Sequence, residues 1–358
     1  MAAPQVVIRT DASTHIGSGH VMRCLTLAGM LREKGAEVTF VSREQPGHLA
    51  EHVRRMGHRV HLLPPAEQPA SGWLGVSWEQ DADETRQVLP AEGIEWLVVD
   101  HYGLDQRWEA ALHPSARRLL VVDDLADRPH DCDLLLDQNL CAGMETRYQG
   151  LVPAGCRLLL GPRYALLRPE FREARKGLGP RSGHVSRILV FFGGADADNQ
   201  TEKALDALAM LGTRDLAIDV VVGASNPHQA RIGERCALLA GATLHVATPH
   251  MATLMAQADL AIGAGGTTTW ERCYLGLPSL ILTLADNQVP LVAAVAAQEA
   301  AWNLGPAEAV SAAAIRDQLV ELLADPARVA NAARRALDVM AGNGEQTVAD
   351  WMWEAAGV

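Results

Sequence analysis

The first stretch of the sequence that could do chemistry is a glycine-containing loop directly after an apolar run near the N-terminus. The chain passes through Asp11, Gly17 and Gly19 to His20, where a helical pattern begins. Glycines let backbone amides approach a ligand closely, and amides at a helix N-terminus favour an anion. The third glycine of a dinucleotide-binding GxGxxG motif would fall at Met22, so the loop does not indicate NAD. We predict an anionic substrate in contact with Asp11, Gly17, Gly19 and Arg23.

His20 is the histidine at the end of this loop, and its position suggests an acid–base role. A helix N-terminus carries a partial positive charge, which disfavours imidazolium and leaves a neutral histidine able to accept a proton. A histidine at this position can equally cap the helix or contact phosphate. The spacing alone leaves both interpretations open.

The most informative loop lies further along the chain, where glycines and threonines open another helical pattern. Gly265, Gly266, Thr267 and Thr268 offer amides and hydroxyls that can bind a diphosphate. Glu271 follows about one helical turn later. A carboxylate there would repel phosphate, but it could accept both hydroxyls of a ribose. The alternative is that Glu271 is a capping partner of the helix.

A further pair of glycines, Gly193 and Gly194, repeats the order of strand, glycine loop and helix. We predict that this loop also contacts the substrate. A tight turn in which Asp198 or Asn199 caps the helix would account for the same residues.

Polar clusters also follow several of the apolar runs, namely Asp100–Tyr102, Asp123–Asp124, Asp137–Asn139 and Asp286–Gln288. The carboxyl ends of parallel strands meet at one edge of a sheet, so we expect these clusters to converge there. From them we select as candidate site residues Tyr102, Asn139, Asn287 and Gln288. Any one cluster could instead form a cap or a turn. No aspartate pair has the spacing of a dedicated metal site, and we predict neither a metal nor another cofactor.

These loops need strands and helices to position them. Short, unbroken apolar runs alternate with helical patterns along nearly the whole chain, which is typical of parallel sheets covered on both faces. The alternation stops between Arg172 and Ser186, a basic segment that we interpret as a linker. The sequence therefore predicts an α/β fold of two doubly wound, Rossmann-like domains facing a cleft. Their expected ranges are 1–175 and 186–344, with a terminal helix at 345–358 that could pack back on the first domain.

Composition argues against several other classes of protein. The chain has 358 residues, enough for two hydrophobic cores, and a formal net charge of −12. An acidic chain with only 4% aromatic residues is not expected to bind nucleic acid. We expect no membrane span and no signal peptide, because the apolar runs are short and no basic region precedes the first one. The six cysteines form no CxxC pair and indicate reduced thiols in a cytoplasmic protein, while the oligomeric state stays open.

Taken together, these motifs resemble the UDP-sugar hydrolases of pseudaminic acid biosynthesis, which belong to the GT-B superfamily. The resemblance covers nearly the whole chain, in order. It rests on Arg9–Ser13, Ile16–His20, Arg23–Leu25, Val99–Tyr102, Asp123–Asp127, Asp137–Asn139, Gly161–Leu167, Gly193–Gly194, Gly265–Glu271 and Asp286–Gln288. The segment from Gly265 to Glu271 is shared more widely with GT-B glycosyltransferases.

The resemblance implies a GT-B fold whose C-terminal domain holds the nucleotide. It also implies metal-independent hydrolysis of the anomeric C–O bond of a UDP-activated diacetamido-trideoxy sugar, with release of UDP and the free sugar. The essential histidine of the family matches His20, its ribose-binding glutamate matches Glu271, and its tyrosine near the reacting centre matches Tyr102.

UDP is a good leaving group, so such an enzyme must mainly stabilise charge on the diphosphate and place one water opposite it. The loop from Gly265 to Thr269 could serve the first need, and a neutral His20 could deprotonate the water. Tyr102 and Asn139 are candidates to orient the water or the sugar, and attack opposite UDP would invert the anomeric centre. Two alternatives are a GT-B glycosyltransferase with a UDP-sugar donor and a non-catalytic nucleotide-sugar binding protein.

Overall fold

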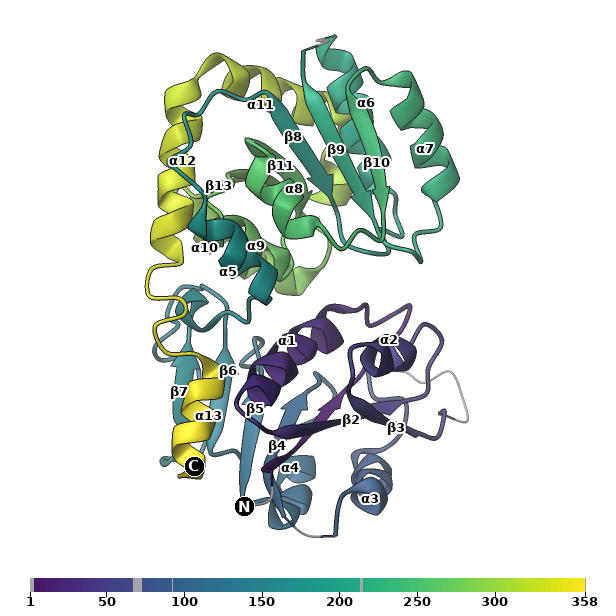
Figure 1. Cartoon of the computed structure of the whole chain (residues 1–358), viewed down its shortest axis with the longest axis vertical. Coiled ribbons are helices and arrows are strands. Elements are labelled where there is room, and N and C mark those ends of the chain that lie inside the picture. Colours follow the sequence, from purple (N-terminus) through teal and green to yellow (C-terminus); the bar gives the residue numbers. More distant parts are fainter. Residues whose placement is uncertain (1–2, 67–72, 92, 213–214, 358) are drawn as a thin grey trace. The chain divides into compact units, whose positions relative to one another are not determined.

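The computed structural model describes residues 3–66, 73–91, 93–212 and 215–357. The chain divides into two compact units, each built around a parallel β-sheet (Figure 1). Unit 1 comprises Met1–Asn139, Gly143–Leu166 and Gly342–Val358. Unit 2 comprises Leu140–Ala142 and Leu167–Ala341.

The sheet of unit 1 has the strand order β3-β2-β1-β4-β5-β6-β7, and its neighbouring strands are parallel. The strands are β1 Gln5–Thr10, β2 Glu37–Arg43, β3 Arg59–Leu63, β4 Ile94–Asp100, β5 Arg118–Val122, β6 Leu134–Asp137 and β7 Arg157–Leu160. The helices of this unit are α1 Gly19–Glu33, α2 Ala50–Arg55, α3 Trp78–Val88, α4 Gln106–Leu112 and α13 Val348–Ala356.

Alternate residues of these strands enter two separate hydrophobic cores, one on each face of the sheet. Ile8 and Val98 belong to the core that includes α1 and α13. Val7 and Leu97 belong to the other core, to which α4 contributes the fully buried Trp108. Because both faces are covered, the central strands β1, β4 and β5 contain continuous apolar runs, which is the pattern that predicted them.

The sheet of unit 2 has the order β10-β9-β8-β11-β12-β13 and is also parallel. Its strands are β8 Arg187–Phe191, β9 Ala217–Val222, β10 Ala242–Val246, β11 Leu260–Ala264, β12 Ser279–Thr283 and β13 Ala301–Pro306. Its helices are α5 Pro169–Lys176, α6 Gln200–Leu211, α7 Gln229–Leu238, α8 Met251–Gln257, α9 Thr268–Tyr274, α10 Val289–Ala297, α11 Ala312–Ala324 and α12 Pro326–Val339. No helix in the described part of the chain is long and apolar enough to cross a membrane.

Helix α5 occupies part of the segment that the sequence analysis interpreted as a linker. Its Phe171 is fully buried in a core of unit 2 with Leu189 and Met255. This burial explains why the chain passes from unit 1 to unit 2 between Leu166 and Leu167, earlier than the expected boundary at residue 175.

Helix α13 lies within unit 1 and begins with a capping box. The Thr347 hydroxyl accepts a hydrogen bond from Asp350 N at 3.2 Å, and Asp350 Oδ2 accepts one from Thr347 N at 2.7 Å. Trp96 Nε1, from β4, donates to Met352 O at 3.1 Å. Lys34 Nζ, just after α1, lies 2.6 Å from Asp350 Oδ1. The helix is therefore fixed to both the sheet and α1.

Candidate active site

The N-terminal loop and the end of β4 meet where the strand order of unit 1 reverses. Thr10, the last residue of β1, pairs with Asp100, the last residue of β4. In doubly wound sheets, the carboxyl edge at such a reversal is the usual place for a ligand. Gly17 turns the loop with a φ of 81°, which glycine adopts without strain, and α1 then begins at Gly19.

His20 lies in the first turn of α1 and contacts the carboxylate at the end of β4. Its Nδ1 is 2.6 Å from Asp100 Oδ1. Burial alone would raise the pKa of Asp100, but Arg23 and His20 outweigh burial and hold that pKa well below its usual range. An ionised carboxylate only accepts hydrogen bonds, so we assign the proton of neutral His20 to Nδ1. His20 Nε2 then carries the lone pair that can accept a proton.

Arg23 holds Asp100 from the next turn of the same helix. Its Nε and Nη2 donate to the two oxygens of Asp100, each at 2.6 Å, and its Nη1 donates to Asp124 at 3.1 Å. Nη2 also lies 3.2 Å from His20 Nδ1, but both atoms are donors to Asp100, so we interpret this distance as proximity. The Arg23 side chain is only 5% exposed, and it positions two carboxylates, whereas the sequence analysis expected it to contact the substrate.

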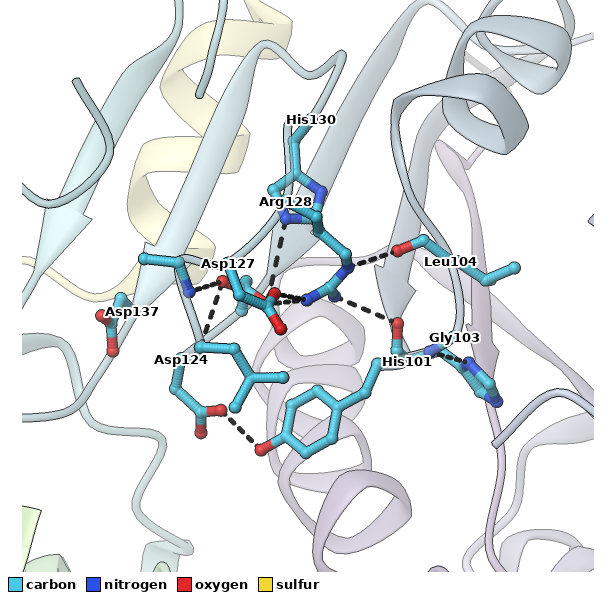
Figure 2. Close-up of polar contacts among 12 residues, drawn as sticks. His101, Gly103, Leu104, Asp124, Asp127, Arg128, His130 and Asp137 are labelled. Atoms are coloured by element: carbon cyan, nitrogen blue, oxygen red, sulfur yellow. Dashed lines mark hydrogen bonds and ion pairs between the residues drawn. The ribbon is translucent and has the colours of Figure 1, made fainter. Parts of the chain in front are cut away.

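Asp124, two residues beyond β5, joins three of the predicted residues. Its Oδ1 accepts a hydrogen bond from the Tyr102 hydroxyl at 2.5 Å (Figure 2). Its Oδ2 accepts from Asn139 Nδ2 and from Arg23 Nη1, both at 3.1 Å. Segments that follow β4 and β6 are thereby tied to α1. The sequence analysis noted Asp100 and Asp124 as strand-end residues but selected neither of them.

Two aromatic rings flank His20. The ring centroid of Tyr102 lies 4.6 Å from that of His20 and that of Trp73 lies 5.7 Å away, with interplanar angles of 86° and 80°. The Trp73 and Tyr102 rings also contact each other edge to face, at 4.8 Å. These contacts restrain the imidazole plane. Trp73 was not among the predicted site residues, because it lies outside any strand, helix or polar motif.

Asp11 faces the protein interior, whereas the sequence analysis expected it to contact the substrate. Its side chain is fully buried, and its oxygens accept hydrogen bonds from Arg9 Nη1 at 2.6 Å, Arg9 Nη2 at 3.0 Å and Arg43 N at 2.7 Å. Burial would raise the pKa of Asp11, but Arg9 and His101 hold it well below the usual range. Arg9 and Arg43 also bind the buried Asp81. Asp11 therefore anchors the start of the loop.

His101 completes this buried network and is neutral. Its Nδ1 accepts a hydrogen bond from Gly103 N at 3.0 Å (Figure 2), so its proton lies on Nε2, which is 3.1 Å from Asp11 Oδ2. Burial lowers the pKa of His101, and the opposing effect of Asp11 is smaller.

Asp137, at the end of β6, positions Asn139 through its backbone. Asp137 Oδ1 accepts from Asn139 N at 2.9 Å, and Oδ2 accepts from Arg147 Nη1 at 2.8 Å. Burial raises the pKa of Asp137 to about 7, despite these two contacts. A carboxyl that titrates near neutral pH therefore lies directly beside a predicted site residue.

In unit 2, the loop after β8 is a turn held by Asp196. Gly193 has a φ of 97°, and Gly194 O accepts a hydrogen bond from Gly223 N at 3.0 Å. Asp196 accepts from Gln200 N at 2.9 Å and from Thr201 N at 2.8 Å, which caps the start of α6. Asn199 occupies the N-cap position of α6, as the alternative from sequence allowed, but its side chain makes no capping hydrogen bond, and Asp196 supplies these bonds instead.

The loop after β11 needs glycine at position 265 for internal packing. A Cβ on Gly265 would lie 2.3 Å from Val292 Cγ2 on α10. A Cβ on Gly266 would meet no described atom within 4 Å. Helix α9 then begins at Thr268, and Thr267 precedes it without a side-chain capping bond. Gly266, Thr267 and Thr268 are thus the members of this loop that are at least partly exposed.

Glu271, on α9, has one carboxylate oxygen paired and one unpaired. Oε1 accepts from Arg168 Nε at 3.2 Å and from Arg168 Nη2 at 3.0 Å. Oε2 is buried and has no hydrogen-bond partner among the described residues. Burial raises the pKa of Glu271, and Arg168 opposes this shift only in part. The carboxylate does not cap α9, because it turns to Arg168. Arg168 was not among the predicted site residues, because no sequence spacing relates it to a residue 103 positions away.

Arg272, the next residue on α9, is a buried cation beside the same loop. Its Nη2 donates to Ala264 O at 2.8 Å and to Thr269 Oγ1 at 3.0 Å, and its Nε has no partner among the described residues. Burial lowers the pKa of Arg272 to about 10, so the guanidinium is still charged at neutral pH.

The last predicted residues, Asn287 and Gln288, lie in the short turn Asp286–Gln288 before α10. Gln288 Oε1 accepts a hydrogen bond from Leu284 N at 2.9 Å, so it stabilises the turn. Asn287 is exposed.

The predicted residues thus form two groups, one in each unit. Unit 1 brings together His20, Arg23, Tyr102 and Asn139 through Asp100 and Asp124. Unit 2 carries the remaining loops at the ends of β8, β11 and β12. In the part of the chain that the structure describes, no group of three or more His, Cys, Asp or Glu side chains could hold a metal ion.

The comparisons with known proteins agree with this architecture. Residues 187–350 match the glycosyltransferase family 28 C-terminal domain. The chain is 30% identical, over 95% of both proteins, to UDP-N-acetylglucosamine--N-acetylmuramyl-(pentapeptide) pyrophosphoryl-undecaprenol N-acetylglucosamine transferase of Acidithiobacillus ferrooxidans. It is 26% identical to the UDP-2,4-diacetamido-2,4,6-trideoxy-beta-L-altropyranose hydrolase of Campylobacter jejuni, over 79% of this chain and 93% of that protein. It spans 55% of the uncharacterized protein MJ1062 of Methanocaldococcus jannaschii, at 24% identity over 78% of this chain.

Among solved structures, Acinetobacter baumannii MurG has a TM-score of 0.63 and 14% identity over 99% of this chain and 98% of that one. Two doubly wound, Rossmann-like units of this kind define a GT-B fold, which confirms the predicted fold class. The chain belongs to glycosyltransferase family 28.

Proposed function

We propose that this enzyme hydrolyses a UDP-sugar at the anomeric C–O bond, with inversion and release of UDP. The observation that carries the proposal is the 2.6 Å contact between His20 Nδ1 and Asp100 Oδ1, which leaves Nε2 as a proton acceptor. Single displacement by water needs such a base. The 26% identity to the Campylobacter jejuni hydrolase, over 93% of that protein, supports the same reaction.

In this reaction, His20 Nε2 takes a proton from water while the water oxygen bonds to the anomeric carbon. The C–O bond to UDP breaks, and its electron pair stays with the diphosphate oxygen. The imidazolium that forms is stabilised by ionised Asp100, whereas the N-terminus of α1 disfavours it. Tyr102 and Asn139, both held by Asp124, are proposed to orient the water or the sugar.

We further propose that unit 2 holds the nucleotide. Glu271 Oε2 is a buried acceptor without a partner among the described residues, which suits the hydroxyls of a ribose. Gly266, Thr267 and Thr268 offer amides and hydroxyls to the diphosphate, and the charge of Arg272 beside them favours an anion. The sugar is proposed to be a diacetamido-trideoxy hexose, by similarity to the substrate named for the Campylobacter jejuni relative.

A glycosyltransferase is the second candidate, and it is favoured by the 30% identity to the Acidithiobacillus ferrooxidans transferase over 95% of both chains. The pair of His20 and Asp100 would then deprotonate an acceptor hydroxyl in place of water. The two functions share the donor and differ in the molecule that attacks it.

The deciding experiment incubates the protein with a panel of UDP-sugars, including the diacetamido-trideoxy sugar, with EDTA present and no acceptor. We expect stoichiometric UDP and free sugar, with the anomer formed first, seen by NMR, inverted relative to the substrate. Release of UDP only after addition of an acceptor would establish a transferase. Loss of activity in EDTA that is restored by a divalent cation would contradict metal-independent hydrolysis.

A further inference from the structure

Arg168 is held in a fixed position next to Glu271. The residue immediately precedes α5, and its guanidinium lies 4.8 Å from the ring centroid of Phe171, which is fully buried. Its Nη1 is 2.9 Å from Glu170 Oε1, while Nε and Nη2 both donate to Glu271 Oε1. Helices α5 and α9 pack against each other (Figure 1). Stacking and two ion pairs therefore define the orientation of the guanidinium.

This arrangement leaves the two oxygens of Glu271 in different states. Oε1 receives two N–H groups, whereas Oε2 keeps both lone pairs and has no partner among the described residues. A buried acceptor without a hydrogen bond costs free energy, which a ligand hydroxyl would recover. The two neighbouring hydroxyls of a ribose match the two lone pairs of one oxygen.

We propose that Arg168 is a positioning residue that engages Oε1 of Glu271 and leaves Oε2 to accept hydrogen bonds from the ribose, and that it thereby sets the preference for ribose over 2′-deoxyribose. This inference rests on the proposed function, because it takes the nucleotide site of unit 2 as given. Without the 2′-hydroxyl, one lone pair of the buried oxygen would stay unsatisfied, so a deoxynucleotide should bind more weakly.

The charged groups around Glu271 explain why Arg168 decides its ionisation. Burial raises the pKa of Glu271 and Glu170 raises it further, while Arg168 has the largest lowering effect and Arg272 a smaller one. Arg272 donates its hydrogen bonds to Ala264 and Thr269. Helix α12 also packs against α9, but its charged residues beside that contact, Arg334, Arg335 and Asp338, are exposed.

Without Arg168, burial and Glu170 still raise the pKa of Glu271, and only Arg272 lowers it, so this pKa should be higher than in the wild type. Protonated Glu271 carries a hydroxyl donor and accepts hydrogen bonds less well than the carboxylate. Nucleotide affinity that needs the carboxylate is present above the pKa of Glu271 and lost below it. A higher pKa in the variant thus moves the loss of affinity to higher pH.

The test is calorimetric titration of UDP and 2′-deoxy-UDP into wild type, Arg168→Gln, Arg168→Lys, Glu271→Ala and the control Arg172→Gln, from pH 6 to pH 9. Arg172 lies on the same helix and has no ion pair among the described residues. We expect Arg168→Gln to bind UDP about 10-fold more weakly at pH 7, with affinity recovering as the pH rises. Its preference for UDP over 2′-deoxy-UDP should shrink at pH 7, and Arg172→Gln should match wild type.

Arg168→Lys keeps the charge but cannot bring two N–H groups of a planar guanidinium to Oε1, so it should lie between wild type and Arg168→Gln. The inference is overturned if the Arg168→Gln protein folds and shows the same preference for UDP over 2′-deoxy-UDP, and the same pH dependence of UDP affinity, as the wild type. If Arg168→Gln does not fold, the same wild-type behaviour in Arg168→Lys overturns it. A wild-type protein that binds no UDP, or a Glu271→Ala variant with unchanged affinity, would instead contradict the proposed nucleotide site.

Discussion

Asp100 and Asp124 connect the side chains of unit 1 that the sequence analysis selected for catalysis. Asp100 fixes the tautomer of His20, and Asp124 ties Tyr102 to Asn139. Arg23 bridges the two carboxylates. The pair of His20 and Asp100 follows the logic of a base oriented by a carboxylate, in which the carboxylate supports the proton acceptor without taking the proton itself.

The sharpest consequence concerns His20. If His20 is the base, His20→Asn should lower turnover by about 10²–10⁴-fold, the usual scale of general base catalysis, because no acceptor remains for the proton of water. Turnover at saturating UDP-sugar and UDP affinity should be measured on the same variant.

A histidine that merely contacts phosphate would give the opposite pattern. UDP would then bind more weakly to His20→Asn while turnover at saturation stayed near normal. That result would remove His20 as the base and leave Asp100 or Tyr102 to be considered.

Asp100 offers an independent test of the tautomer. An amide in Asp100→Asn can donate to His20 Nδ1, which would move the histidine proton to Nε2 and remove the acceptor. We expect turnover to fall at least about 10²-fold while UDP affinity stays within a factor of two or so, because the pair only supports the chemical step. Arg23 loses one of its two charge partners in this variant and keeps Asp124, so circular dichroism must confirm folding at the assay temperature.

If instead Asp100→Asn stays folded and retains most of its turnover, the carboxylate does not set the protonation of His20. The proposed mechanism would then lose the observation that carries it.

Residue types and spacing predicted part of the candidate site. The rest could not be predicted, because it depends on contacts between segments that are far apart in the sequence. His20 was selected because it follows the glycine loop at the start of a helix, and Tyr102 and Asn139 because they follow strands, where residues reach the sheet edge whatever their neighbours are. Asp11 occupies the same kind of position, yet it is buried by Arg9 of its own strand and by the backbone of Arg43 on the adjacent β2. Which polar residue at a strand end faces solvent depends on contacts between strands, and local sequence does not contain them.

At the level of the elements, apolar strands were predictable and polar or edge elements were not. Strands such as β1 and β4 are buried on both faces, so their sequences are continuous apolar runs. Helix α3 was missed because its sequence WEQDADETRQV offers few apolar residues to mark a face. Strand β13 was missed because it ends in Gly305 and Pro306, which an edge strand tolerates and a central strand does not.

Helix α13 depends on its first turn, which makes the capping box testable. Thr347→Ala should lower the free energy of unfolding by about 1 kcal/mol, because Asp350 N loses its acceptor. Thermal unfolding followed by circular dichroism should show a midpoint lower by about 2–4 °C. Thr347→Ser keeps the hydroxyl and serves as the matched control. An unchanged midpoint for Thr347→Ala would mean that the contacts of the helix with the sheet and with α1 fix it without the capping bond.

At the level of the whole molecule, the two units have related architectures and different chemistry. Each has a parallel sheet whose order reverses once, between β1 and β4 in unit 1 and between β8 and β11 in unit 2. Unit 1 places a histidine and carboxylates at its reversal, and unit 2 places glycines, threonines and Glu271 there. The alternation of apolar runs and helical patterns predicted both sheets, because helices cover both faces of the sheet in each unit.

The place of α13 in unit 1 sets an order of events during synthesis. Val348 and Met352 are buried with Ile8 and Val98 in one core, yet all of Leu167–Ala341 is translated between these two groups. Domains usually fold as they emerge from the ribosome, beginning with the N-terminal one. Here the unit that is begun first is finished last. Until α13 is synthesised, the indole of Trp96 and the apolar face of α1 lack their contacts with this helix. Exposed apolar surface promotes aggregation, so the nascent chain must be protected from aggregation during that interval.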